Sequence, residues 1–172
     1  MERRAAVELR ASGRRLEGYA ASFGVPAQIG GFVEVIQPGA FRAALLMKKD
    51  VLALVDHDPG RLLARTSSGT LRLEEDAKGL RFELDVPDTQ LGRDVLALAE
   101  RRDLGGMSFG FRVNDEAWPT RDRRELRAVD LIEVSIVQAH PAYSQTTISA
   151  RARTMGHAEA VARLRRAMVE AL

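Results

Sequence analysis

The chain of 172 residues contains no cysteine, which excludes disulfide bonds, a thiol nucleophile and cysteine-ligated metal sites. Histidine is also scarce, so a zinc site with three histidines would need His57, His140 and His157 together. The triplet of Asp56, His57 and Asp58 offers little to a metal, because neighbouring side chains of a strand point to opposite faces. No glycine-rich loop has the spacing and the lysine of a phosphate-binding loop. We therefore expect neither a metal nor a cofactor.

Long apolar runs are missing as well. No run approaches the roughly 20 residues that a membrane span needs. Residues 1–15 are charged, unlike a signal peptide. We therefore expect a soluble, intracellular protein with no membrane partner.

Aromatic side chains make up only 5% of the chain, and none occurs in residues 1–15 or 151–172. Each of these two segments carries five Arg and two Glu, so both ends are basic and residues 16–150 are net acidic. A nucleic-acid surface usually combines basic charge with aromatic side chains that stack on bases. We therefore favour solvated termini over binding to nucleic acid.

The length suits one domain with a single core and two tails. We expect a basic N-terminal arm over residues 1–14, a folded domain over residues 15–150 and a basic tail over residues 151–172. The tail is predicted to be an amphipathic helix because helical spacing places four apolar residues on one face: Val161, Leu164, Met168 and Leu172.

Alternating or short apolar runs predict seven strands, at residues 15–24, 32–36, 51–58, 69–76, 79–87, 107–113 and 126–138. Helical spacing predicts two helices, at residues 38–49 and 89–103. Asp88 or Thr89 is the expected N-cap of the second helix. These elements favour an α+β, mainly β fold: an antiparallel, closed or nearly closed β-barrel of about seven strands with helices packed outside.

The stretch LGGMSFGF, residues 104–111, places Ser108 among three glycines. Glycines in a strand leave room for another part of the chain to come close. A serine hydroxyl becomes a nucleophile only beside a base, which a third group must orient. Ser108, His57 and an acid from a third strand have the chemistry for this. The alternative is a structural serine in an ordinary strand.

The pattern Gly106-x-Ser108-x-Gly110 also matches the nucleophile elbow of α/β-hydrolases. In those enzymes the histidine follows the serine along the chain, whereas His57 precedes Ser108 here. An esterase or amidase that acts on small acyl substrates is therefore an alternative, which a strand-turn-helix at Ser108 would favour.

Six motifs follow one another along the chain: GYAASFG, IQPGAFRAAL, VDHD, GTLRLEEDAKGLRFELDVPDT, LGGMSFGF, and LIEVSIV followed by PAY. In this order and at these spacings they resemble the prohead serine proteases of tailed bacteriophages, the capsid maturation proteases. That family is thought to be related to the herpesvirus assemblins. The resemblance covers roughly residues 15–150.

The resemblance implies an assemblin-like fold and assigns roles to three residues. His57 would be the general base, Ser108 the nucleophile, and Glu133, in the EVS motif, the third member of the triad. Assemblins use a second histidine as the third member, so His140 is the alternative to Glu133.

Alternation along LIEVSIV predicts that Glu133 and Ser135 share a face of the strand with Leu131. A carboxylate among apolar neighbours needs a partner, because burying it unpaired is costly. We expect that partner to be His57.

After this strand the chain reads VQAHPAY, with more residues before PAY than the family often has. From their position, we expect the backbone N–H groups of Ala142 and Tyr143 to stabilise the tetrahedral intermediate.

The resemblance further implies a serine endopeptidase that processes the scaffolding segment of the major capsid protein, and itself, inside the assembling prohead in the host cytoplasm. Its partners would be the major capsid protein and its scaffolding segment. We also expect a homo-oligomer, with a dimer as one form, because assemblins work as dimers. The alternative is a catalytically silent β-barrel that acts as a scaffold or assembly protein of the capsid.

Overall fold

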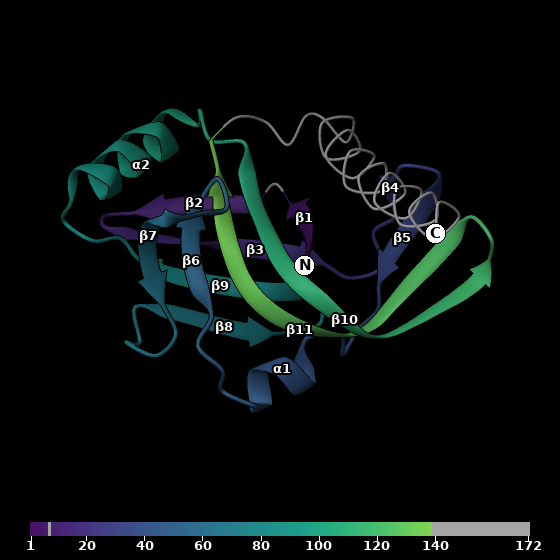
Figure 1. Cartoon of the computed structure of the whole chain (residues 1–172). Coiled ribbons are helices and arrows are strands. Elements are labelled where there is room, and N and C mark those ends of the chain that lie inside the picture. Colours follow the sequence, from purple (N-terminus) through teal and green to yellow (C-terminus); the bar gives the residue numbers. More distant parts are fainter. Residues whose placement is uncertain (7, 139–172) are drawn as a thin grey trace, which may run out of the picture.

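The structure is a computed structural model that describes residues 1–6 and 8–138 (Figure 1). The described residues form eleven strands, arranged in two sheets, and two helices. The expected tail helix at residues 151–172 lies outside them. Neither described helix is long and apolar enough to cross a membrane.

Two long strands dominate the larger sheet. It contains β1 (Glu2–Ala6), β10 (Gly106–Thr120), β11 (Arg123–Val137), β5 (Phe32–Ile36), β4 (Ala27–Ile29), β6 (Leu52–Val55) and β7 (Asp58–Arg65). The first five follow one another across the sheet, while β6 pairs with β11 and with β7. β10 and β11 form a long antiparallel hairpin that runs through the middle of the molecule (Figure 1). Every residue expected in the catalytic site and described here comes from this hairpin or from the β6–β7 turn beside it.

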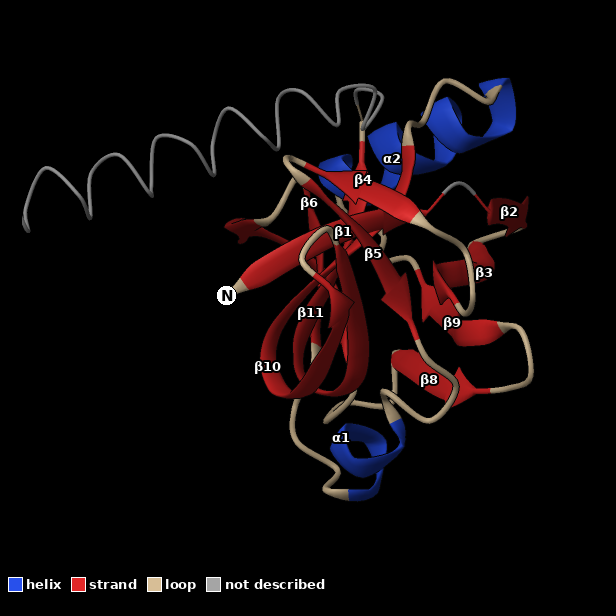
Figure 2. Ribbon diagram, turned by 90° about the vertical axis from the view of Figure 1, so that its right-hand side faces the viewer, coloured by secondary structure: helices blue, strands red, loops and turns tan. Residues whose placement is uncertain are grey.

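The smaller sheet consists of four antiparallel strands in the order β2 (Glu8–Ser12), β3 (Arg15–Ser22), β9 (Gly79–Asp85) and β8 (Leu71–Glu75). It packs against one face of the larger sheet (Figure 2). Residues 1–14, expected as a basic arm, thus contain two paired strands. β1 pairs with β10, and β2 pairs with β3.

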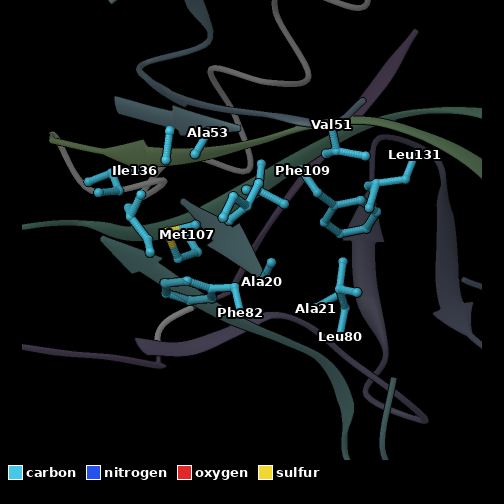
Figure 3. Packing of buried hydrophobic residues seen from close by; sticks show 14 of the residues in the cluster. Ala20, Ala21, Val51, Ala53, Leu80, Phe82, Met107, Phe109, Leu131 and Ile136 are labelled. Carbon is cyan, nitrogen blue, oxygen red and sulfur yellow. The ribbon is translucent and has the colours of Figure 1, made fainter. Parts of the chain in front are cut away.

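The core lies between the two sheets. Ala20 and Phe82 from the smaller sheet meet Met107, Phe109 and Ile136 from the larger one (Figure 3). All five are at most 1% exposed. Burial of each large side chain contributes roughly 1.5–3 kcal/mol. Because alternate residues of a strand point to opposite faces, this core occupies one face of β10 and β11 and leaves the other face to polar residues.

The helices are short. α1 (Arg42–Leu46) is shorter than the predicted 38–49, and α2 (Gln90–Arg101) matches the prediction at 89–103. Thr89 is the N-cap of α2, and its hydroxyl accepts a hydrogen bond from Gly92 N at 3.1 Å.

The mainly β composition with two helices is confirmed in the described residues, but a closed barrel is not found there. Both sheets are open: β1, β4 and β7 end the larger one, and β2 and β8 end the smaller one. The larger sheet is also mixed rather than antiparallel, because β11 pairs in parallel with β5 at its start and with β6 near its end. β11 therefore forms hydrogen bonds with two separate strands, β5 and β6, along the edge opposite β10.

Candidate active site

His57 lies in a tight turn between β6 and β7, not in the strand predicted over residues 51–58. Asp56 and His57 both have positive φ, 52° and 61°, as in the type I′ turns that join antiparallel strands. Asp and His are among the residues that tolerate this conformation best. Asp56 N donates to Ile136 O at 2.9 Å, and Gln138 N donates to Asp56 Oδ1 at 2.9 Å. These bonds tie the turn to the end of β11.

The side chain of His57 meets that of Glu133. His57 Nδ1 and Glu133 Oε1 are 2.7 Å apart, and the two side chains are 15% and 4% exposed. Parallel pairing sets Val55, at the end of β6, beside Ile136, so the turn that follows lies at the end of β11 and the side chain of His57 contacts Glu133 from there. An ionised carboxylate only accepts hydrogen bonds, so a neutral imidazole beside it would carry its proton on Nδ1 and present the lone pair of Nε2. The ring is thereby arranged as a base.

Ser108 lies on the same face of the sheet as Glu133. Antiparallel pairing places Ser108 opposite Ser135 and Gly110 opposite Glu133. Residues opposite each other on paired strands project to the same side. Ser108 is 3% exposed. In the described part of the chain, its hydroxyl forms no hydrogen bond with His57. Such catalytic hydrogen bonds are often long until substrate is bound.

Ser108 sits inside β10 and not on a turn between a strand and a helix. The nucleophile elbow of α/β-hydrolases requires that turn. The match of Gly106-x-Ser108-x-Gly110 to the elbow pattern is therefore a coincidence of sequence.

A β-bulge corrects the expected alternation in β11. Gly110 pairs with Glu133, but the next residue, Phe111, pairs with Leu131, so Ile132 is an extra residue in β11. Leu131 consequently joins Phe111 in the core, where it is 3% exposed, and does not share the face of Glu133. Strict alternation put Leu131 on the wrong face because a bulge has no signature in a run of apolar residues.

Sequence reasoning gave Ser135 no role, but it contacts the carboxylate directly. Its Oγ donates to Glu133 Oε2 at 2.5 Å, and Ser135 is fully buried. The signal was present in the spacing of Glu133 and Ser135, because residues two apart on a strand share a face.

Three other expected site residues, His140, Ala142 and Tyr143, lie outside the described residues. Within residues 1–6 and 8–138, no group of three or more His, Asp or Glu side chains is arranged to hold a metal ion.

Residues 2–160 match the family model of the caudovirus prohead serine proteases. The chain belongs to this family. This prohead protease is therefore a serine protease, and its family indicates a role in the maturation of phage capsids. The match includes β1 and β2 as well as the strands of the site. Comparisons with curated proteins and with solved structures gave no significant match.

Proposed function

We propose that Ser108, His57 and Glu133 are the catalytic triad of this prohead protease. The observation that carries the proposal is the buried contact of 2.7 Å between His57 Nδ1 and Glu133 Oε1, on the face of the sheet that also holds Ser108. The same contact favours Glu133 over His140 as the third member, because the imidazole Nδ1 already has a carboxylate partner.

In this mechanism Ser108 Oγ attacks the scissile carbonyl carbon while its proton passes to His57 Nε2. Glu133 stays ionised and stabilises the imidazolium that forms. His57 then gives the proton to the leaving amine as the C–N bond breaks, which leaves an acyl group on Ser108. Water, deprotonated by the same imidazole, hydrolyses this ester and restores the free serine.

The substrate we propose is the scaffolding segment of the major capsid protein, together with the protease itself. Processing would take place in the assembling prohead within the host cell, with the protease acting as a homo-oligomer. The substrate we propose is an extended, flexible peptide that lies across the face of the larger sheet, because β10 is paired on both edges at Ser108.

The test is co-expression with the major capsid protein of the same genome, followed by intact-mass analysis of both proteins. The wild-type protease should shorten the capsid protein by its scaffolding segment and trim itself, while Ser108→Ala leaves both whole. Ser22→Ala, at the end of β3 and away from the site, is the matched control and should cut normally.

Uncut capsid protein with the wild-type protease, in particles that still assemble, would overturn the proposal and favour a silent scaffold. Normal cutting by Ser108→Ala would overturn the assignment of the nucleophile.

A further inference from the structure

Both oxygens of the Glu133 carboxylate have partners in the site. Oε1 faces His57 Nδ1 at 2.7 Å, and Oε2 accepts a hydrogen bond from Ser135 Oγ at 2.5 Å. Hydrogen bonds to an ionised carboxylate are shorter and stronger than neutral ones. The hydroxyl thus fixes one oxygen and leaves the other directed at the imidazole.

The space for the carboxylate comes from Gly110, the residue opposite Glu133 on β10. A Cβ built on Gly110 would lie 2.5 Å from Glu133 Oε1 and 2.9 Å from its Cγ. The backbone of Gly110 does not have a positive φ, so the requirement is for space and not for glycine's conformational freedom. The room left by the glycines around Ser108 is filled at this position by a side chain of the site.

We propose that Ser135 and Gly110 are positioning residues of the protease, which rests on the triad proposed above. Ser135 holds Glu133 by its hydroxyl, and Gly110 leaves the space in which the carboxylate lies. Neither residue reacts with substrate. Both act by keeping Glu133 Oε1 on His57 Nδ1.

This positioning has a physical need. A glutamate has three side-chain torsions, and fixing a long side chain costs conformational entropy. A carboxylate that turned away would no longer orient the imidazole, and a misplacement of about 1 Å in a catalytic group can slow a reaction about 100-fold. Because Ser135 and Glu133 are two apart on one strand, the hydroxyl and the carboxylate meet without any rearrangement of the backbone.

The first test is the kinetics of Ser135→Ala on a peptide that spans the junction found by intact mass. We expect kcat to fall about 10- to 100-fold with KM unchanged, because the hydroxyl does not touch substrate. Ser135→Thr, which keeps the hydroxyl, should recover most of the rate. Ile136→Val is the matched control: it trims the core on the opposite face, so it should lower Tm and leave kcat unchanged.

The second test does not depend on activity. In Ser108→Ala protein, the Nδ1 proton of His57 should give a strongly downfield NMR resonance, because it is bonded to a buried carboxylate. The additional change Ser135→Ala should shift or broaden that resonance, while Ile136→Val should not. A wild-type kcat for Ser135→Ala, or an unchanged resonance, overturns the proposal for Ser135. Loss of the triad assignment alone would instead show as cutting by Ser108→Ala.

The role of Gly110 is tested by a double-mutant comparison with Glu133. Gly110→Ala should lower both kcat and Tm, whereas Gly31→Ala, where a Cβ meets nothing within 4 Å, should lower neither appreciably. If the new methyl group collides with the carboxylate, its effect on Tm should be smaller in a Glu133→Asp background, where the carboxylate is drawn back. Equal losses of Tm in both backgrounds would overturn the proposal for Gly110.

Discussion

Strand β11 carries two buried charged groups, one near each end, and the protein treats them differently. Near its start, Arg124 donates to Glu2 at 2.8 and 3.0 Å, to Glu34 at 3.0 Å and to Glu116 at 2.6 Å. Near its end, Glu133 contacts the imidazole of His57 and the hydroxyl of Ser135. The first group is a cation with three carboxylate partners, and the second is a carboxylate with a titratable imidazole among its partners.

The difference separates a structural charge from one suited to catalysis. Burial disfavours the charged form of Arg124, but hydrogen bonds to Glu2 and Glu116 and the charges of Glu2 and Glu34 outweigh it and raise the pKa of the guanidinium above its usual value. Arg124 therefore stays charged throughout the working range of pH. Glu133 faces His57, whose ring can accept a proton and return it. The Arg124 cluster, in which the cation has three carboxylate partners, stabilises the fold. The Glu133–His57 pair contains a titratable imidazole and is therefore suited to proton transfer.

The largest effect should come from breaking the contact between Glu133 and His57. Glu133→Gln keeps the shape of the side chain but presents a neutral amide to His57, so it should lower kcat about 10⁴-fold, as loss of the triad carboxylate does elsewhere. The measurement is peptide cleavage with purified protein, and circular dichroism should show an unchanged fold. A loss of less than tenfold would argue against Glu133 as the third member.

Breaking the Arg124 cluster at the start of β11 should lower the stability of the fold. Arg124→Met leaves three buried or half-buried carboxylates without their cation, so we expect a loss of about 3–5 kcal/mol in the free energy of unfolding. Urea denaturation measures it. Arg112→Met, at an exposed arginine of β10, is the control and should change stability by no more than about 0.5 kcal/mol. A similar result for both variants would contradict the structural role given to Arg124.

A smaller change in the Arg124 cluster should cost less stability and leave activity unchanged. Glu34→Gln removes one charge from the Arg124 cluster but keeps an oxygen that accepts a hydrogen bond, so it should cost about 1–2 kcal/mol. Since Glu34 lies on β5 and pairs with the start of β11, away from Glu133, kcat at 25 °C should match that of the wild type. Reduced kcat in fully folded protein would mean that the two ends are coupled.

The smallest effect should come from a charge pair at the surface. Hydrogen bonds from Arg65 and from the backbone of Ser67 hold the pKa of Asp50 well below its usual range. Because the folded-state pKa lies below the unfolded one, the stabilisation is present above the unfolded pKa of about 3.9 and is lost as pH falls toward the folded value. Asp50→Asn should therefore flatten the fall in stability below about pH 5, measured by urea unfolding across pH. An equally steep fall in the variant would contradict this assignment.

Features that depend on neighbours along the chain could be predicted from the sequence alone. Alternating apolar residues predicted a mainly β protein. The sequence also offered Asp88 or Thr89 as the N-cap of α2, and Thr89 is the N-cap in the structure. Ordered motifs pointed to the prohead protease family, and with it to His57, Ser108 and Glu133. Two of these three side chains are in contact in the structure.

Features that depend on pairing between distant strands could not be predicted in this way. The turn that carries His57 reads as the end of an apolar strand, and only pairing of β6 with β11 and β7 brings it to Glu133. The bulge at Ile132 shifts the register of β11 against β10, and this shift places Leu131 in the core. Gly110 is needed for the space it leaves, and this need follows from the strand pairing that places Glu133 opposite it. Local patterns fix which residues are buried, but register between distant strands fixes which of them meet.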